Sequence, residues 1–184
     1  MDYYLDIQVK PDLEITAPAL LNNLFAKFHR VMAQTCKGQI AVSFPNYGRV
    51  LGDVLRLHGS KPAIELLMAQ PWLKGLRDYT QVGDVLPVPS DLIGYRTVSR
   101  VQKKSPQNLR KRSIAKGWLT EEEAENKIPD TKQRQLDLPY LQLQSLSNKN
   151  VLRICVKHGD ITQQAISGEY SSYGFSAQAT IPWF

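Results

Sequence analysis

The order of hydrophobic patterns over residues 1–88 restricts the fold more than any other feature of this sequence. Apolar residues alternate with polar ones over residues 3–9, which predicts a strand. Residues 16–34 have apolar side chains at helical spacing, with Thr16 at the capping position. The elements predicted next are strands at 39–44 and 50–59, a helix at 60–71 and a strand at 79–88. This order is that of a ferredoxin-like βαββαβ fold.

The second half of the chain predicts a different mixture of elements. Ser105 and Pro106 begin a basic helix that ends near Gly117. Thr120 and Glu123 have the spacing of a capping box ahead of a second helix. Strand-like segments are predicted at 97–102, 138–147, 151–159 and 181–184. We therefore expect an α+β protein with a ferredoxin-like domain at 1–94 and an α+β domain at 95–184, which contains the inserted basic helix.

Positive charge is concentrated in this second half. The whole chain has 23 Lys and Arg and 17 Asp and Glu, a net charge of +6. Residues 1–95 contain 9 basic and 9 acidic side chains, whereas residues 96–184 contain 14 and 8, so the later segment holds the whole excess. Residues 100–116 are rich in Lys and Arg and have no carboxylate. A solvated face is the ordinary explanation of a charge run, but this complete lack of acidic partners favours a nucleic acid ligand.

Several classes of site are absent from the sequence. The chain has no Walker loop, no GxGxxG and no GxSxG motif. The three histidines show no paired spacing, and the glutamates at 121–125 suit the first turn of a helix, so we expect no metal and no cofactor. Cys36 and Cys155 are far apart and fit no disulfide spacing. No apolar run could span a membrane, and the N-terminus reads as a strand, so we expect a cytoplasmic protein.

Short motifs spread along the chain resemble one family. They are MDYYLDI and KPD at the start, KFHR around His29, IAVSFP, PWLKGLRDY, YRTVSRVQKKS, KIPDT, SSYGFS and the final IPWF. Together they are similar to the subtype I-F CRISPR repeat-RNA endoribonucleases, the Csy-type members of the Cas-six family. The resemblance covers Met1 to Phe184.

This resemblance implies an activity. Family members cut a CRISPR precursor transcript on the 3′ side of each repeat hairpin without a metal. The upstream 2′-hydroxyl attacks the scissile phosphate and leaves a 2′,3′-cyclic phosphate and a 5′-hydroxyl. The enzyme then stays on the product hairpin and joins the other subunits of the subtype I-F interference complex. The expected partners are therefore the CRISPR repeat RNA hairpin and those subunits.

The resemblance also assigns an active site. His29 matches the catalytic histidine, and an imidazole can accept the 2′-hydroxyl proton near neutral pH. Ser145 matches the serine that holds the 2′-hydroxyl in line, and Ser147 would face the same way on a regular strand. Tyr173 matches an active-site tyrosine that orients the histidine or the backbone. From residue type alone, a packing histidine, strand-face hydroxyls and a half-buried aromatic ring remain the alternatives.

Two residues are candidates for reading base identity. Arg100 and Gln102 are two apart on a predicted strand, so their side chains would face one way. Arginine can bind the O6 and N7 edge of guanine, and glutamine the N6 and N7 edge of adenine. The major groove of an RNA helix hides its bases from side chains, but we expect it to be open at a helix end. The resemblance assigns this pair to the lowest base pairs of the hairpin, and an exposed edge strand is the alternative.

The basic helix is expected to bind the stem. The resemblance places it in the major groove, with Arg112 near the scissile phosphate, where a cation offsets developing charge. Ala115 and Gly117 stand where the family has basic residues. The cations expected to bind RNA at this helix and just before it are Lys103, Lys104, Arg110, Lys111, Arg112 and Lys116.

Leu152 departs from the family pattern. It stands where the family has a phenylalanine that stacks on the base at the bottom of the stem, and leucine has no π face. Aromatic stacking is worth ~1–3 kcal/mol per base. A slow or non-cleaving RNA-hairpin-binding subunit is therefore the second hypothesis beside the endoribonuclease. A scaffold that binds only protein is the third, and the carboxylate-free basic segment disfavours it.

Overall fold

The structure is a computed structural model that describes residues 1–102, 105–132, 136–144 and 150–184. The elements of the first half are β1 (Tyr3–Val9), α1 (Ala17–Thr35), β2 (Ala41–Ser43), β3 (Val54–Gly59), α2 (Lys61–Met68), η1 (Pro71–Leu73), η2 (Arg77–Tyr79), β4 (Thr80–Val82) and β5 (Leu86–Pro87). Those of the second half are β6 (Gly94–Arg96), β7 (Val98–Val101), α3 (Pro106–Ala115), α4 (Glu121–Lys127), η3 (Asp130–Lys132), β8 (Tyr140–Gln144), β9 (Val151–His158) and β10 (Ile181–Trp183). Helices combined with antiparallel sheets confirm the α+β class.

The chain divides into two compact units. The first comprises Met1–Val101 and Leu138–Phe184, and the second comprises Gln102–Asp137. The division falls there because β9 and β10 return to pair with β7 and β6 of the first unit. The boundary expected between residues 94 and 95 stays a prediction, since these units divide the chain at other positions.

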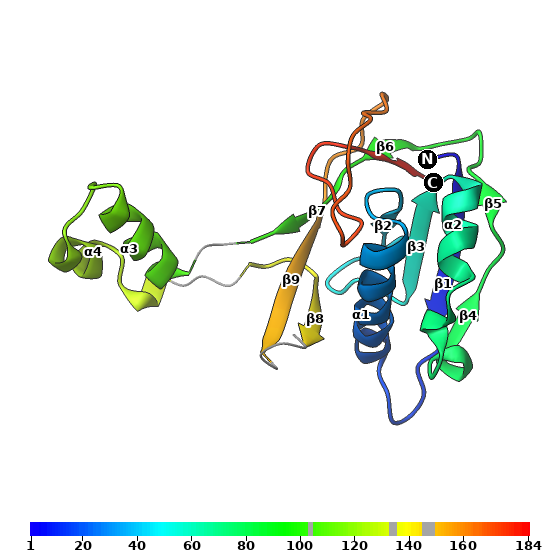
Figure 1. Ribbon diagram of the computed structural model, residues 1–184, viewed down its shortest axis with the longest axis horizontal. Coiled ribbons are helices and arrows are strands. Elements are labelled where there is room, and N and C mark those ends of the chain that lie inside the picture. The colour runs from blue at the N-terminus through cyan, green and yellow to red at the C-terminus, as the bar shows by residue number, and fades with distance from the viewer. Residues whose placement is uncertain (103–104, 133–135, 145–149) are drawn as a thin grey trace. The chain divides into compact units, whose positions relative to one another are not determined.

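The larger sheet of the first unit has the strand order β2-β3-β1-β4, and β5 also pairs with β1. All of these pairings are antiparallel. Helices α1 and α2 contact each other and both pack against β1 and β3 (Figure 1). Leu5, Ile7 and Val9 of β1 are buried as their alternation predicts, and Phe25 and Phe28 of α1 are fully buried with them. Packing against this core fixes the position of α1, including the side of the helix that faces away from the core.

A second antiparallel sheet has the order β7-β9-β8. It is tied to α1, because the backbone N–H of Gln142 in β8 donates to Asn22 Oδ1 at 2.9 Å. The chain therefore brings β7, β8 and α1 together within the first unit. No helix in the described part of the chain is long and apolar enough to cross a membrane.

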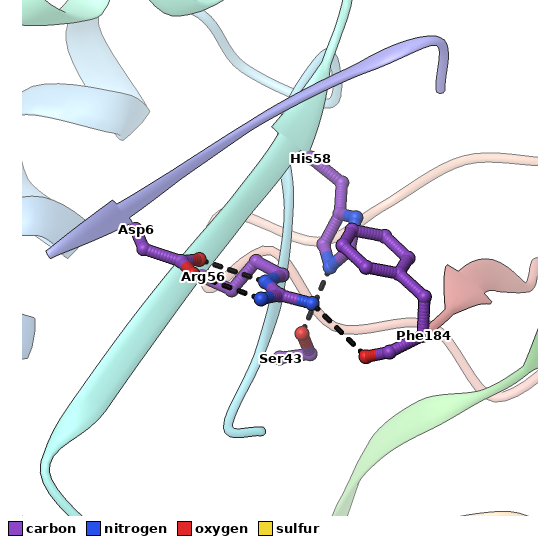
Figure 2. Close-up of polar contacts among 5 residues, drawn as sticks. All are labelled: Asp6, Ser43, Arg56, His58 and Phe184. Carbon is purple, nitrogen blue, oxygen red and sulfur yellow. Dashed lines mark hydrogen bonds and ion pairs between the residues drawn. The ribbon is translucent and has the colours of Figure 1, made fainter. Parts of the chain in front are cut away.

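A cluster of polar contacts fastens the C-terminal residue to the larger sheet (Figure 2). Arg56 donates to both carboxylate oxygens of Asp6, with N···O distances of 2.7 and 2.8 Å, and to the backbone oxygen of Phe184. The Phe184 ring lies 4.2 Å from the Arg56 guanidinium carbon. Beside them, Ser43 Oγ and His58 Nε2 lie 2.8 Å apart, and both residues are fully buried. These contacts join β1, β2, β3 and the chain end.

The second unit depends on helix ends and charge pairs. Ser105 accepts a hydrogen bond from the Asn108 N–H, and Thr120 and Glu123 form the capping box that the sequence predicts. By contrast, Thr16 of α1 occupies the capping position without making a side-chain capping bond. Among the described residues of the second unit, Pro106 and Ala124 are buried. We infer that hydrogen bonds at the helix ends contribute more to this unit than apolar burial does.

Candidate active site and RNA-binding residues

His29 lies on α1, one residue after the buried Phe28, and its ring is half-buried. Its Nδ1 atom is 2.8 Å from the backbone oxygen of Ser172. A carbonyl oxygen can only accept a hydrogen bond, so Nδ1 must hold the proton in this contact. In the neutral ring, Nε2 is then the unprotonated nitrogen. The geometry therefore presents Nε2 of His29 as a proton acceptor.

Tyr173 stacks directly on His29. Their ring centroids are 3.9 Å apart and the ring planes differ by 3°. The rings of Phe25 and Phe175 are nearly parallel to that of Tyr173, each with a centroid separation of 6.4 Å. The hydrogen bond to Ser172 holds one atom of the imidazole, and the stack fixes the plane of its ring.

The turn that supplies Ser172 and Tyr173 is fixed against β2. Gly174 adopts a φ of +74°, and its N–H donates to the Ser171 oxygen at 2.8 Å. The Val42 N–H in turn donates to the Gly174 oxygen at 3.1 Å. A Cβ atom at Gly174 would lie 2.9 Å from Val42 Cγ1, so both the conformation and the close approach require glycine.

Arg100 reaches the same group of rings from β7. Its guanidinium carbon lies 5.4 Å from the Tyr173 centroid. Its Nε atom is buried and has no hydrogen-bond partner among the described residues. Gln102 does not share this strand, because β7 ends at Val101, and Gln102 is exposed. Arg100 thus lies on β7 and Gln102 directly after it, and the expectation that their side chains face one way stays a prediction.

Four of the predicted site residues fall outside the described part of the chain, namely Lys103, Lys104, Ser145 and Ser147. Leu152 lies on β9, opposite Leu143 of β8, and 37% of its surface is exposed. Leu152 is therefore accessible to a ligand, as the resemblance requires of that position.

The basic residues of α3 and its C-terminal end fall into two groups. Lys111, Arg112 and Lys116 are exposed. Arg110 is half-buried and donates to Asp130 Oδ1 at 2.8 Å and to the Ile128 oxygen at 2.7 Å. Arg110 thus has a structural contact that the basic segment 100–116 did not reveal, because its acidic partner, Asp130, lies 20 residues further along the chain.

Trp118 is a residue that the sequence reading did not select. Its side chain is 62% exposed, and Lys116 Nζ lies 4.6 Å from its ring centroid. Gly117, with a φ of +67°, ends the helix just before it. An aromatic residue next to a basic run is the signal that could have identified it, because such rings can stack on bases.

The two other histidines, His58 and His158, lie in buried surroundings that suit a structural role. Burial lowers the pKa of His58 to about 3, and the nearby Arg56 acts in the same direction. Burial lowers the pKa of His158 to about 4, and Arg96 again adds to the shift. The hydroxyl of Ser43 contacts His58, but neither side chain is accessible to a substrate. Among the described residues, no group of three or more His, Cys, Asp or Glu could hold a metal ion.

Comparisons with known proteins cover almost the whole chain. Residues 4–184 match the family described as CRISPR-associated protein (Cas_Csy4). The chain is 49% identical over 185 residues to the CRISPR-associated endonuclease Cas6/Csy4 of Escherichia coli (strain UTI89 / UPEC), and 100% of each chain is covered. It is 42% identical over 190 residues to the protein of the same name from Pseudomonas aeruginosa (strain UCBPP-PA14), again with 100% of each chain covered. A solved structure of the CRISPR endoribonuclease Cse3 bound to 19 nt RNA is 13% identical, with a TM-score of 0.37, over 99% of this chain and 100% of that one.

Proposed function

This chain belongs to the Cas_Csy4 family of CRISPR-associated proteins, and from that premise we propose that it cuts CRISPR precursor RNA at the 3′ base of each repeat hairpin. The observation that supports this most directly is the contact between His29 Nδ1 and the Ser172 oxygen. It leaves Nε2 of a half-buried imidazole as a proton acceptor on a rigid element. RNA supplies the nucleophile itself, so a positioned base is the first group that the reaction needs.

The proposed reaction is a transesterification. Nε2 of His29 accepts the proton of the ribose 2′-hydroxyl as that oxygen bonds to the adjacent phosphorus. The bond between phosphorus and the 5′ oxygen breaks, and the departing oxygen acquires a proton. The products are a 2′,3′-cyclic phosphate and a 5′-hydroxyl, and no metal takes part. Ser145 is proposed to hold the 2′-hydroxyl in line, and Tyr173 to keep the imidazole plane fixed.

RNA binding is proposed to use separate groups of residues. Exposed Lys111, Arg112 and Lys116 suit phosphate contacts, which position an RNA without reading its sequence. Arg100 and Gln102 are proposed to contact the foot of the stem. The product hairpin stays bound, and the protein then joins the other subunits of the interference complex. The exposed Leu152 favours a second candidate, a hairpin-binding subunit that cuts slowly, because leucine stacks on a base less well than an aromatic ring.

The test combines chelation with a base-deficient variant. The protein is incubated with its own repeat RNA in EDTA, under single-turnover conditions, and the product ends are mapped. We expect cleavage to persist and to give a cyclic phosphate, and His29→Ala to lose a factor of about 10²–10⁴ in rate with nearly unchanged hairpin affinity. Loss of cleavage in EDTA that magnesium restores would contradict the metal-independent reaction. A His29→Ala rate within a few-fold of the wild type would place the base elsewhere.

A further inference from the structure

Arg100 and His29 both contact the ring of Tyr173, and the three residues come from three separate segments of the first unit. The Arg100 guanidinium from β7 lies over Tyr173 at 5.4 Å from the ring centroid. Tyr173, from the turn after β9, stacks on His29 of α1 with a centroid separation of 3.9 Å. The sequence separates Arg100 from Tyr173 by 73 residues and from His29 by 71. Their contact is therefore a product of the tertiary fold.

Arg100 is a partly buried cation with a buried donor that lacks a hydrogen-bond partner among the described residues. A guanidinium is always charged, and a buried N–H normally finds an acceptor. Arg100 Nε is buried without a hydrogen-bond partner among the described residues. Among the described residues, the charge of Arg100 interacts with the π face of the Tyr173 ring. The position of the guanidinium is thus coupled to the position of that ring.

The same ring determines how His29 is oriented. Within the described ranges of the chain, one hydrogen bond holds the imidazole, from Nδ1 to the Ser172 oxygen, and a single bond allows the ring to tilt about that contact. The stacking of Tyr173, with planes 3° apart, removes this freedom and so directs Nε2. Any change that shifts the Tyr173 ring should therefore change the direction in which His29 accepts a proton.

We propose that Arg100 is a positioning residue for His29, acting through the ring of Tyr173. Arg100, which is proposed to contact the foot of the hairpin, then has a second effect. It also keeps His29 aligned to accept a proton from bound RNA. This inference rests on the proposed function of His29. It differs from a base-reading role because it predicts a loss of rate when all the RNA is bound, in addition to a loss of affinity.

The first test is a double-mutant cycle at saturating protein. Arg100→Ala should slow single-turnover cleavage of bound hairpin by about three- to thirtyfold, the rate equivalent of a partly desolvated cation–π contact. In a Tyr173→Leu background the same change should cost less than about twofold, because the mediating ring is gone. Arg100→Lys keeps the cation and should recover part of the rate. Lys157→Ala, which removes an exposed charge from neighbouring β9, is the matched control and should leave the saturated rate unchanged.

Equal rate losses in the two backgrounds, or no loss at saturation, would overturn the proposal. A second measurement works without RNA. In ¹³C-histidine-labelled protein, Arg100→Ala should move the His29 ring signals and leave those of the buried His58 in place, while Lys157→Ala leaves the signals of both histidines unchanged. Unchanged His29 signals in Arg100→Ala would refute the coupling whatever His29 does in cleavage. If those signals move but His29→Ala still cuts normally, the coupling stands and the proposed role of His29 in cleavage fails.

Discussion

The two compact units hold their shape by different means. The unit of Met1–Val101 and Leu138–Phe184 has fully buried rings, including Phe25, Phe28 and Phe44, and three antiparallel sheets. The described residues of Gln102–Asp137 bury little beyond Pro106 and Ala124 and depend on helix caps and the ion pair of Arg110 with Asp130. One unit is fixed by packing, the other by polar contacts.

This difference matches the tasks that we propose for each unit. A general base must be held within hydrogen-bond reach of one proton, which requires a rigid support. His29 has that support from α1 and from the turn at 171–175. Phosphate contacts act over longer distances and tolerate movement, so a small basic unit without a large core can provide them. Changes to the residues around His29 should therefore alter rate, and changes to the exposed lysines of the second unit should alter affinity.

Acid should affect the first unit most strongly. The pKa of His58 is about 3 in the folded protein and about 6.5 in the unfolded chain, so below pH 6.5 the unfolded state binds a proton that the folded state excludes. Stability is fully present above pH 6.5 and falls by up to roughly 1.4 kcal/mol per pH unit as the pH drops towards 3. His158, lowered to about 4, adds in the same direction. Residues 102–137 contain no histidine, so the second unit lacks this effect.

Urea unfolding at pH 7, 6, 5 and 4 measures this slope. A Trp118→Phe variant restricts the fluorescence to Trp72 and Trp183, which both belong to the first unit. His58→Gln, whose amide does not titrate and can still meet Ser43, should flatten the slope. A free energy of unfolding that is constant between pH 7 and pH 4 would show that burial of His58 has no such consequence.

Gly174→Ala should weaken cleavage next most strongly. A Cβ atom there would be strained by the φ of +74° and would press on Val42 at 2.9 Å, so the turn beneath His29 must shift. We expect about a tenfold or greater loss of rate at saturating protein, since the left-handed conformation alone costs ~1–2 kcal/mol. Gly75→Ala is the matched control, because Gly75 has a φ of +80° but open space around its Cβ position. A similar rate for both variants would mean that the turn does not position His29.

Much of the fold could be predicted from local patterns. The spacing of apolar residues indicates which side chains are buried, and capping residues indicate where a helix begins. The alternation in β1, the apolar stripe of α1 and the capping box at Thr120 all correspond to observed elements. Neighbouring residues encode such features directly. The resemblance likewise selected His29 and Tyr173, and the structure brings them into contact.

The remaining features depend on contacts between distant segments. The Ser172 oxygen that fixes the His29 tautomer is a backbone atom, which a residue type does not reveal. The ion pair of Arg110 joins residues 20 apart, and the end of β7 at Val101, before Gln102, is set by pairing with β9. Periodicity within one segment contains no information about these pairings.

The smallest expected effect is that of single cations in the second unit. Lys111 is exposed, so Lys111→Ala should weaken binding of any stem of similar shape and reduce the slope of log affinity against log salt by about one unit or less. The saturated cleavage rate should stay unchanged, because a phosphate contact orients the RNA without touching His29.

Arg110→Ala provides the contrast: it breaks the contacts with Asp130 and Ile128, so it should also lower the thermal stability of the helices in this unit. Titrations at two salt concentrations, on hairpins of cognate and altered sequence, separate the two. A Lys111→Ala loss confined to the cognate sequence would show that Lys111 reads bases, and its assignment as a phosphate contact would then be wrong.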